Sequence, residues 1–227
     1  MRRRLLAVGA FGLVVAGCAA PPREVSIEAH APADFPEQAY RQAAAAGRAV
    51  YRIDRTASLV VIEVRRGGAL ARLGHDHVVA SHNVGGYALP DAKRADIYVP
   101  LVTLTVDEPA LRAEAHFDTQ PSADDIAGTG RNMRERVLEV ARYPFATIAV
   151  RSLGADFVDA AITLHGATRT FHVPVHALVD ARTIDVAGQI TLRQSDFGIT
   201  PLSVLGGAVQ VQDALALRFT LRARRVQ

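Results

Sequence analysis

The sequence predicts an all-β domain: an antiparallel barrel of eight or slightly more strands with one helical insertion. Short segments rich in β-branched residues recur from residue 50 onward, with turn-forming residues between them. Several of these segments alternate apolar and polar side chains, which is typical of strands with one buried face. Because closure into a barrel removes the exposed edges of such a sheet, we expect a closed barrel.

The strands follow from this alternation. We predict them at residues 50–54, 58–64, 78–89, 95–106, 112–117, 145–153, 157–164, 170–179, 184–192 and 209–223. Successive side chains of a strand point to opposite faces, so alternate residues share a face. The clearest inward sets are Ala160, Ile162 and Leu164 in one strand and Phe171, Val173 and Val175 in the next. Between them, His165-Gly166-Ala167-Thr168 has the residues of a hairpin turn.

One stretch, residues 122–140, has a different period. Ile126, Met133 and Val137 recur there at spacings near three and four among charged residues, which predicts an amphipathic helix. Pro144 ends the helical stretch, since the residue before a proline is disfavoured in helical geometry. We therefore expect one helix inserted between strands.

The first seventeen residues have the pattern of a secretory signal. Three arginines precede an apolar run from Leu5 to Val15, and small residues stand directly before Cys18. The run is too short to cross a hydrocarbon core, which needs roughly 20 apolar residues. The ending Val15-Ala16-Gly17-Cys18 resembles the lipobox of bacterial lipoproteins, which implies cleavage before Cys18 and its acylation. The alternative is an ordinary secreted protein with a stray cysteine.

These features divide the chain into three parts. Residues 1–17 are the predicted signal, 18–48 a lipid anchor and flexible proline-containing tether, and 49–227 the barrel domain. The net charge of +3 equals the charge of the three signal arginines, so the processed chain is near neutral and lacks the basic surface of a nucleic-acid-binding protein. With Cys18 as its single cysteine, the chain has no intramolecular disulfide.

Several runs resemble the YceI-like family, lipocalin-like barrels of exported bacterial proteins. The resemblance covers about residues 50–225, and its most specific runs are the hairpin and the Asp-Phe-Gly segment. The runs are Tyr51-Arg52-Ile53-Asp54, Val84-Gly85-Gly86, Ala141-Arg142-Tyr143-Pro144-Phe145-Ala146, Leu164-His165-Gly166-Ala167-Thr168, Ser195-Asp196-Phe197-Gly198-Ile199 and the strand from Val209. Members of this family enclose long isoprenoid or fatty chains, which implies the same here.

The resemblance thus implies a ligand with a long apolar tail: an isoprenoid quinone, a polyisoprenoid, or a fatty acid or amide. Such a ligand needs a deep apolar channel, because each buried methylene contributes roughly 0.8 kcal/mol. For each residue that could line such a channel, the alternative is that its side chain packs in the hydrophobic core and faces no cavity. The candidate lining residues are Ile148, Val150, Ile162, Leu164, Phe171, Val173, Ile190, Leu192 and Phe197.

Two features depart from the family pattern. Relatives often carry arginine directly before the Ser-Asp-Phe-Gly run, where this chain has Gln194. His75 and His77 stand two residues apart, so on a strand both imidazoles would project from one face. These three residues are candidates for contacting a ligand head group. The two histidines are also a candidate metal site, which would make the protein a metal-binding or redox accessory protein, or they are structural.

The sequence favours a binding protein over an enzyme. No serine lies in a nucleophile elbow, and no glycine-rich phosphate loop follows a strand, so we assign no catalytic residue. The expected location is the bacterial cell envelope, facing the periplasm. Ala19, rather than aspartate, follows the lipidated cysteine, which suggests the outer membrane. The sequence is compatible with either a monomer or a homodimer.

Overall fold

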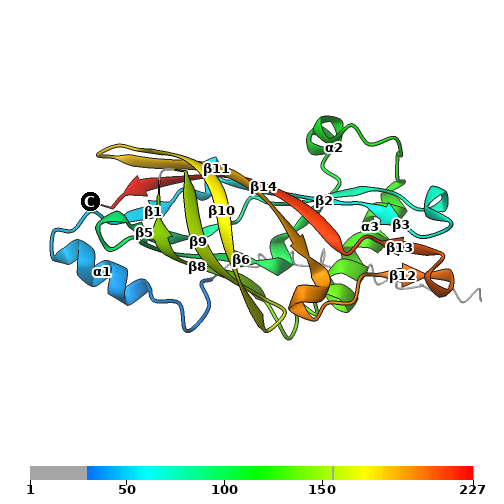
Figure 1. Cartoon of the computed structure of the whole chain (residues 1–227), viewed down its shortest axis with the longest axis horizontal. Coiled ribbons are helices and arrows are strands. Elements are labelled where there is room, and N and C mark those ends of the chain that lie inside the picture. The colour runs from blue at the N-terminus through cyan, green and yellow to red at the C-terminus, as the bar shows by residue number, and fades with distance from the viewer. Residues whose placement is uncertain (1–29, 155, 227) are drawn as a thin grey trace, which may run out of the picture.

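The computed structural model describes residues 30–154 and 156–226, and strands dominate it (Figure 1). The strands are β1 (Tyr51–Ile53), β2 (Leu59–Val64), β3 (Arg66–Gly67), β4 (His77–Ser81), β5 (Gly85–Leu89), β6 (Arg94–Pro100), β7 (Thr105–Val106), β8 (Phe145–Leu153), β9 (Phe157–Leu164), β10 (Ala167–Val179), β11 (Thr183–Arg193), β12 (Ser203–Val204), β13 (Val209–Val211) and β14 (Ala214–Arg225). The helices are α1 (Glu37–Ala45), α2 (Pro109–Ala115) and α3 (Ala123–Asn132).

Eight strands close into an antiparallel barrel. Their order around the ring is β1-β5-β6-β8-β9-β10-β11-β14, and β14 pairs back with β1 to complete it. Each of these strands is therefore hydrogen-bonded on both edges, which leaves no open edge in the ring. The predicted fold class, an antiparallel barrel of eight or slightly more strands, is confirmed. The prediction had one helical insertion, whereas the described residues contain α1, α2 and α3.

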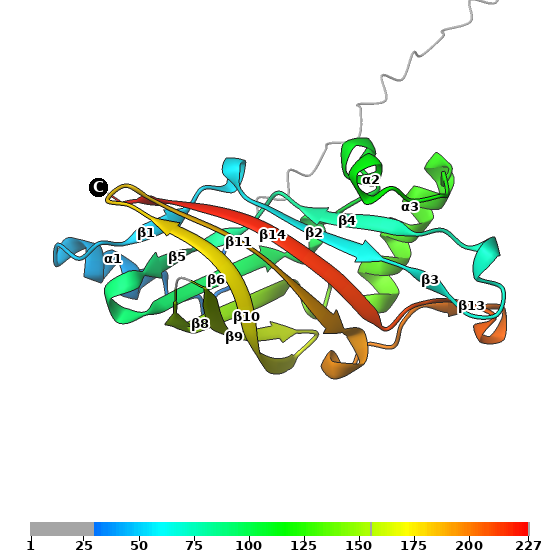
Figure 2. The same cartoon turned by 45° about the horizontal axis from the view of Figure 1, so that its top comes forward.

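The barrel is lengthened on one side. The long strand β14 pairs with β1 near its C-terminal end and with β2 nearer its start, where Leu59 lies opposite Thr220. Strands β4 and β7 continue this wall beyond β2. A small sheet of β12, β13 and β3 lies at this same end of the molecule (Figure 2).

The strand predictions agree best where alternation is strongest. Strands β8 and β9 have the bounds predicted for them. The hairpin after β9 is also confirmed: His165 and Gly166 both have positive φ, at 51° and 77°, as a tight two-residue turn requires. The predicted run 78–89 is split into β4 and β5, and 95–106 into β6 and β7.

The predicted strand at residues 112–117 is wrong, because residues 112–115 belong to helix α2 and His116 is its C-cap. Pro109 is in its first turn, where a proline loses no helical hydrogen bond. Leu111 packs with Val61 and Val78 on the outside of the barrel wall. The segment was too short for its period to separate strand from helix.

The predicted amphipathic helix is confirmed as α3. Ser122 and Asp125 form a capping box at its start, with each side chain accepting from the other's backbone N–H. The helix continues into a π-helical turn, η5 (Met133–Val137), before the chain enters β8. It lies at the end of the molecule that holds β3 and β13 (Figure 1).

Helix α1 packs against the barrel at the opposite end (Figure 1). Tyr40 is 2% exposed, stacks on Tyr87 and donates a 2.7 Å hydrogen bond to Asp96. Burial and the neighbouring Asp96 raise the pKa of Tyr40, which keeps the phenol as a donor. This part of the predicted tether is therefore packed rather than free.

Within the described residues, no helix has the length and hydropathy to cross a membrane.

We expect Tyr40→Ala to detach α1 from the barrel. Removing a buried aromatic side chain costs about 3 kcal/mol or more, and here Asp96 also loses a donor. Urea unfolding and limited proteolysis between residues 30 and 50 measure the effect. Gln38→Ala, an exposed position on the same helix, is the control and should change neither. Equal proteolysis of Tyr40→Ala and the wild type would contradict the packing role.

Candidate functional site: the barrel cavity

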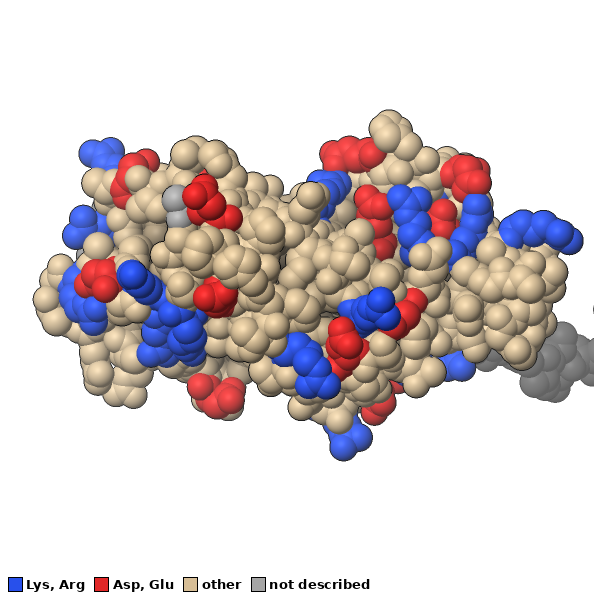
Figure 3. Space-filling model, viewed as in Figure 1, with Lys and Arg blue, Asp and Glu red and all other residues tan. Residues whose placement is uncertain are grey.

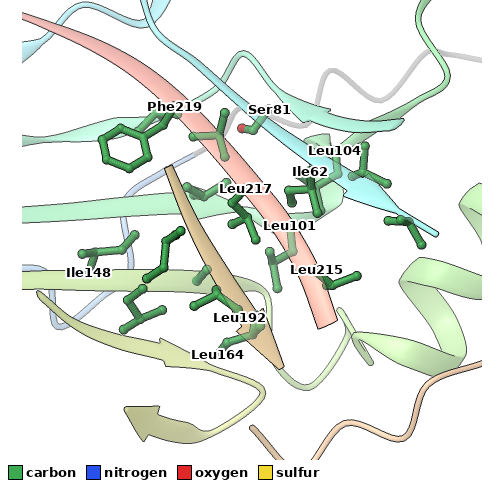
Figure 4. Close-up of a pocket in the computed structure, with 18 of the residues that line it drawn as sticks. Ile62, Ser81, Leu101, Leu104, Ile148, Leu164, Leu192, Leu215, Leu217 and Phe219 are labelled. Atoms are coloured by element: carbon green, nitrogen blue, oxygen red, sulfur yellow. The ribbon is translucent and has the colours of Figure 1, made fainter. Parts of the chain in front are cut away.

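The barrel encloses a cavity of about 1050 Å³. This volume lies at the upper end of ligand pockets, which span roughly 300–1,000 Å³. Figure 4 shows side chains from several strands converging on it, among them Ile62, Ile148 and Leu217. The interior of the barrel is therefore open rather than filled.

The cavity wall follows from the two-residue period of the strands. Inward positions carry mainly Val, Ile, Leu and Ala, whereas aromatic side chains that would fill the space are few. At Gly188 of β11 the inward position has no side chain, and a Cβ there would lie 2.6 Å from the ring of Phe219. The glycine thus makes room for the Phe219 ring, which lines the cavity.

Most of the predicted lining residues do lie on the cavity wall. Phe171 does not: its ring stacks on Phe197 at 6.3 Å between centroids, so Phe197 takes the place at the cavity. Direct contact of the others with a ligand stays a prediction. The predicted residues on the wall are Ile148, Val150, Ile162, Leu164, Val173, Ile190, Leu192 and Phe197.

Sequence reasoning missed a large part of the wall. Strand β14 contributes inward side chains at every second position, and so do β2 and β6. The same alternation was visible in these segments and could have identified them. The missed residues include Val60, Ile62, Val64, Ile97, Val99, Leu215, Leu217, Phe219 and Leu221.

Most of the polar residues of the lining gather at one end. They come from the segment before β4, from α3, and from the turn η6 (Gln194–Phe197), all at the end that holds β3 and β13. The opposite end, near the β10–β11 hairpin, is lined by Ala177, Val179 and Ile184. The polar lining residues at this end are Arg66, His75, His77, Asp124, Asp125, Thr129, Asn132, Arg193, Gln194 and Gln210, whereas Ser81 of β4 and Tyr87 of β5 line the wall elsewhere. The cavity is therefore a mainly apolar tube whose polar residues are concentrated at one end.

A buried ion network holds His77 in place at this end. Its Nδ1 lies 2.6 Å from Asp107 Oδ2, and the Asp107 side chain is fully buried. Asp107 also accepts from the Val78 N–H at 2.9 Å and from Arg112 Nη1 at 2.7 Å. Burial by itself raises the pKa of Asp107, but these hydrogen bonds outweigh it and lower the pKa below its usual value.

The ionised Asp107 fixes the imidazole tautomer. A carboxylate only accepts hydrogen bonds, so Nδ1 of His77 carries the proton. When the ring is neutral, its Nε2 accepts from the Thr129 hydroxyl, 3.3 Å away. The His75 ring lies edge-on to His77, with centroids 6.1 Å apart. The site can offer a ligand head group the oxygen of the Thr129 hydroxyl, which His77 orients.

The metal hypothesis finds little support in this geometry. Both ring nitrogens of His77 have protein partners, and His75 precedes β4 rather than sharing its face. Within the described residues, no group of three or more His, Cys, Asp or Glu side chains is placed to hold an ion. Gln194 lines the cavity, but its amide donates to the Gln212 carbonyl at 2.9 Å. Its head-group role stays a prediction.

Comparisons with known proteins agree with this architecture. A polyisoprenoid-binding domain from Saccharophagus degradans, implicated in plant cell wall breakdown, is 16% identical with a TM-score of 0.54, over 78% of this chain and 98% of that one. Burkholderia cenocepacia BcnA is 15% identical with a TM-score of 0.51, over 75% and 98%. At these identities the likeness shows the fold alone. A search of curated protein sequences gives no match.

The profile of the YceI-like domain matches residues 51–223, which run from β1 to nearly the end of β14. The matched range contains every strand of the closed barrel and the wall of its cavity. The chain therefore belongs to the YceI-like domain family.

Proposed function

We propose that this protein is an exported lipoprotein whose barrel binds or carries an amphiphile with a long apolar tail. The observation that carries the proposal is the cavity, an open aliphatic tube with polar groups at one end. An amphiphile has the same division into tail and head. A tail of ten methylenes would gain about 8 kcal/mol from burial in such a tube.

The ligand classes remain those that the family resemblance implies. They are an isoprenoid quinone, a polyisoprenoid, and a fatty acid or amide. One structural neighbour is described as a polyisoprenoid-binding domain, which supports an isoprenoid tail. The oriented His77 and the adjacent Thr129 would meet the head group, because both reach the cavity at its polar end.

The lipid anchor explains where such a protein would work. Cys18 and the predicted signal lie outside the described residues, so the anchor rests on the lipobox-like sequence. A single acyl chain holds a protein to a bilayer only weakly, whereas two or more give stable attachment. We propose attachment through acylated Cys18 to the outer membrane, facing the periplasm. There the barrel would lie next to the membrane that stores its water-insoluble ligand.

Native mass spectrometry of the full chain purified from membranes tests ligand binding. We expect a co-purifying amphiphile that organic extraction removes, and rebinding of a quinone, a polyprenol or a fatty amide. Absence of any bound amphiphile, together with no rebinding of these three, would overturn the proposal.

The anchor has its own test. Metabolic labelling with an alkyne analogue of palmitate should mark the protein, and Cys18→Ser should abolish the label. An unlabelled wild-type chain in the soluble periplasmic fraction would show a secreted protein without an anchor.

A further inference from the structure

Three exposed aliphatic side chains surround the polar end of the cavity. Leu73 is 61% exposed, Val204 46% and Leu205 69%. They lie on two loops, the turn η2 (Ala71–Leu73) and the segment from β12 into η7 (Leu205–Gly207). The loops are held together because Leu70 N–H donates to the Ala208 carbonyl at 2.7 Å. We call Leu73, Val204 and Leu205 the mouth patch.

The mouth patch continues into the cavity. Leu73 and Val204 are exposed on the surface and also line the cavity wall. Leu202 and Val209, from the same end, line it as well. An apolar path therefore leads from the outer surface into the barrel at this point.

Leu205 is held outward in an unfavourable conformation. Its φ is 52°, in the left-handed region that bulky residues rarely adopt, and Gly206 and Gly207 follow with positive φ. Glycine or asparagine would adopt this conformation more easily and would expose no large apolar side chain. The strained backbone thus places a large apolar side chain on the surface beside the cavity mouth.

The surface around the patch suits a lipid bilayer. Figure 3 shows the area over β12 and β13 as largely uncharged on the face in view. Arg72, next to Leu73 in sequence, is exposed and forms no ion pair with any other residue that the structure describes. Apolar side chains beside a basic one are typical of segments that enter the interface of a membrane.

The sequence also keeps the domain near a bilayer. Residue 30, where the described structure begins, is twelve positions after Cys18. An extended chain of this length spans at most about 43 Å, so an acylated Cys18 would hold the domain within reach of the lipid surface. The occupant that these observations favour is thus the bilayer rather than a protein partner.

We propose that Leu73, Val204 and Leu205 dock into the bilayer surface and connect it to the cavity. The ligand then passes between bilayer and barrel without crossing water. This inference rests on the proposed function, since it assigns a route to the same cavity. Docking itself can be measured without knowing the ligand.

The opposite end of the barrel offers a matched control. Leu178 and Val179 on the β10–β11 hairpin are 61% and 62% exposed, close to the values of Leu73 and Leu205. The hairpin turn carries Asp180 and Arg182, and hydrogen bonds from the turn's own backbone lower the pKa of Asp180. A charged turn of this kind disfavours insertion into hydrocarbon.

Site-specific probes test the docking. Because Cys18 is the single cysteine and is blocked when acylated, Leu205→Cys and Leu178→Cys each give one labelling site in the processed full chain. On vesicles of phosphatidylethanolamine and phosphatidylglycerol, an NBD probe at 205 should shift to the blue and be quenched by doxyl lipids. The emission of the probe at 178 should stay that of a water-exposed fluorophore, without quenching by doxyl lipids. Water exposure at both sites, or equal quenching at both, would overturn docking through the mouth patch.

Transfer kinetics test the route. Leu205→Asn should slow release of a fluorescent polyisoprenoid analogue to acceptor vesicles about fivefold or more, with unchanged equilibrium affinity because Leu205 does not line the cavity. Leu178→Asn, at an exposed side chain that does not line the cavity, should match the wild type. An unchanged transfer rate in the first variant would overturn the route. If the wild type binds no amphiphile, the proposed function fails, while the probe measurement still decides docking.

Discussion

Leu217→Trp should abolish binding of a long-tailed ligand while leaving the barrel folded. Leu217 points into the middle of the cavity from β14, among Ile62, Leu192 and Leu164 (Figure 4). The indole would occupy space that the tail needs, and because that space is open, the overpacking seen in filled cores is largely avoided. We expect affinity to fall about a hundredfold, which corresponds to roughly 2.7 kcal/mol. A titration with a fluorescent polyisoprenoid analogue measures it.

The neighbouring residue supplies the control. Arg218 follows Leu217 on β14, faces outward and forms an ion pair with Glu114. Arg218→Trp adds the same ring to the outside of the barrel and should leave affinity unchanged. Circular dichroism and urea unfolding check that both variants fold. Undiminished binding by a folded Leu217→Trp variant would show that the ligand does not occupy the tube.

Asp107→Ala should lower the free energy of unfolding by about 3–5 kcal/mol. Removing one partner of a buried ion pair leaves the other charge uncompensated. Here Arg112 would remain buried with its Nη1 facing only the Asp76 carbonyl, and His77 would lose the acceptor that orients it. Urea unfolding measures the loss. Asp118→Ala, which removes an exposed carboxylate paired with Arg66, should cost less than about 1 kcal/mol.

The effect of Asp107→Ala should depend on pH in a defined direction. The folded-state pKa of Asp107 is lowered, so its contribution is fully present above the ordinary aspartate pKa of about 4. It is lost as the pH falls through the lower folded-state value. The difference in unfolding free energy between wild type and variant should therefore shrink below about pH 4. A difference that stays constant or grows on acidification would argue against an ionised Asp107.

Local sequence patterns were sufficient to predict most strands of the barrel wall. In β9 every inward residue is apolar over eight positions, so the period alone defines the strand and its buried face. The β9–β10 turn needs a residue that tolerates positive φ, and Gly166 supplies it. For the same reason, most of the predicted lining residues lie on the cavity wall. The lipid anchor on Cys18 is likewise a sequence inference, and it stays a prediction.

The tertiary structure decided what depends on contacts between distant segments. Asp107 and His77 are thirty positions apart, and no pattern at either site indicates that they meet. Phe171 lies on the same face of β10 as the lining residue Val173, yet Phe197 from another segment stacks on it and takes its place at the cavity. Helix α2 forms because Leu111 finds an apolar surface on the outside of β2 and β4. Whether the inward aliphatic side chains meet across the barrel or leave an open cavity depends on its diameter, which the closure of eight strands sets.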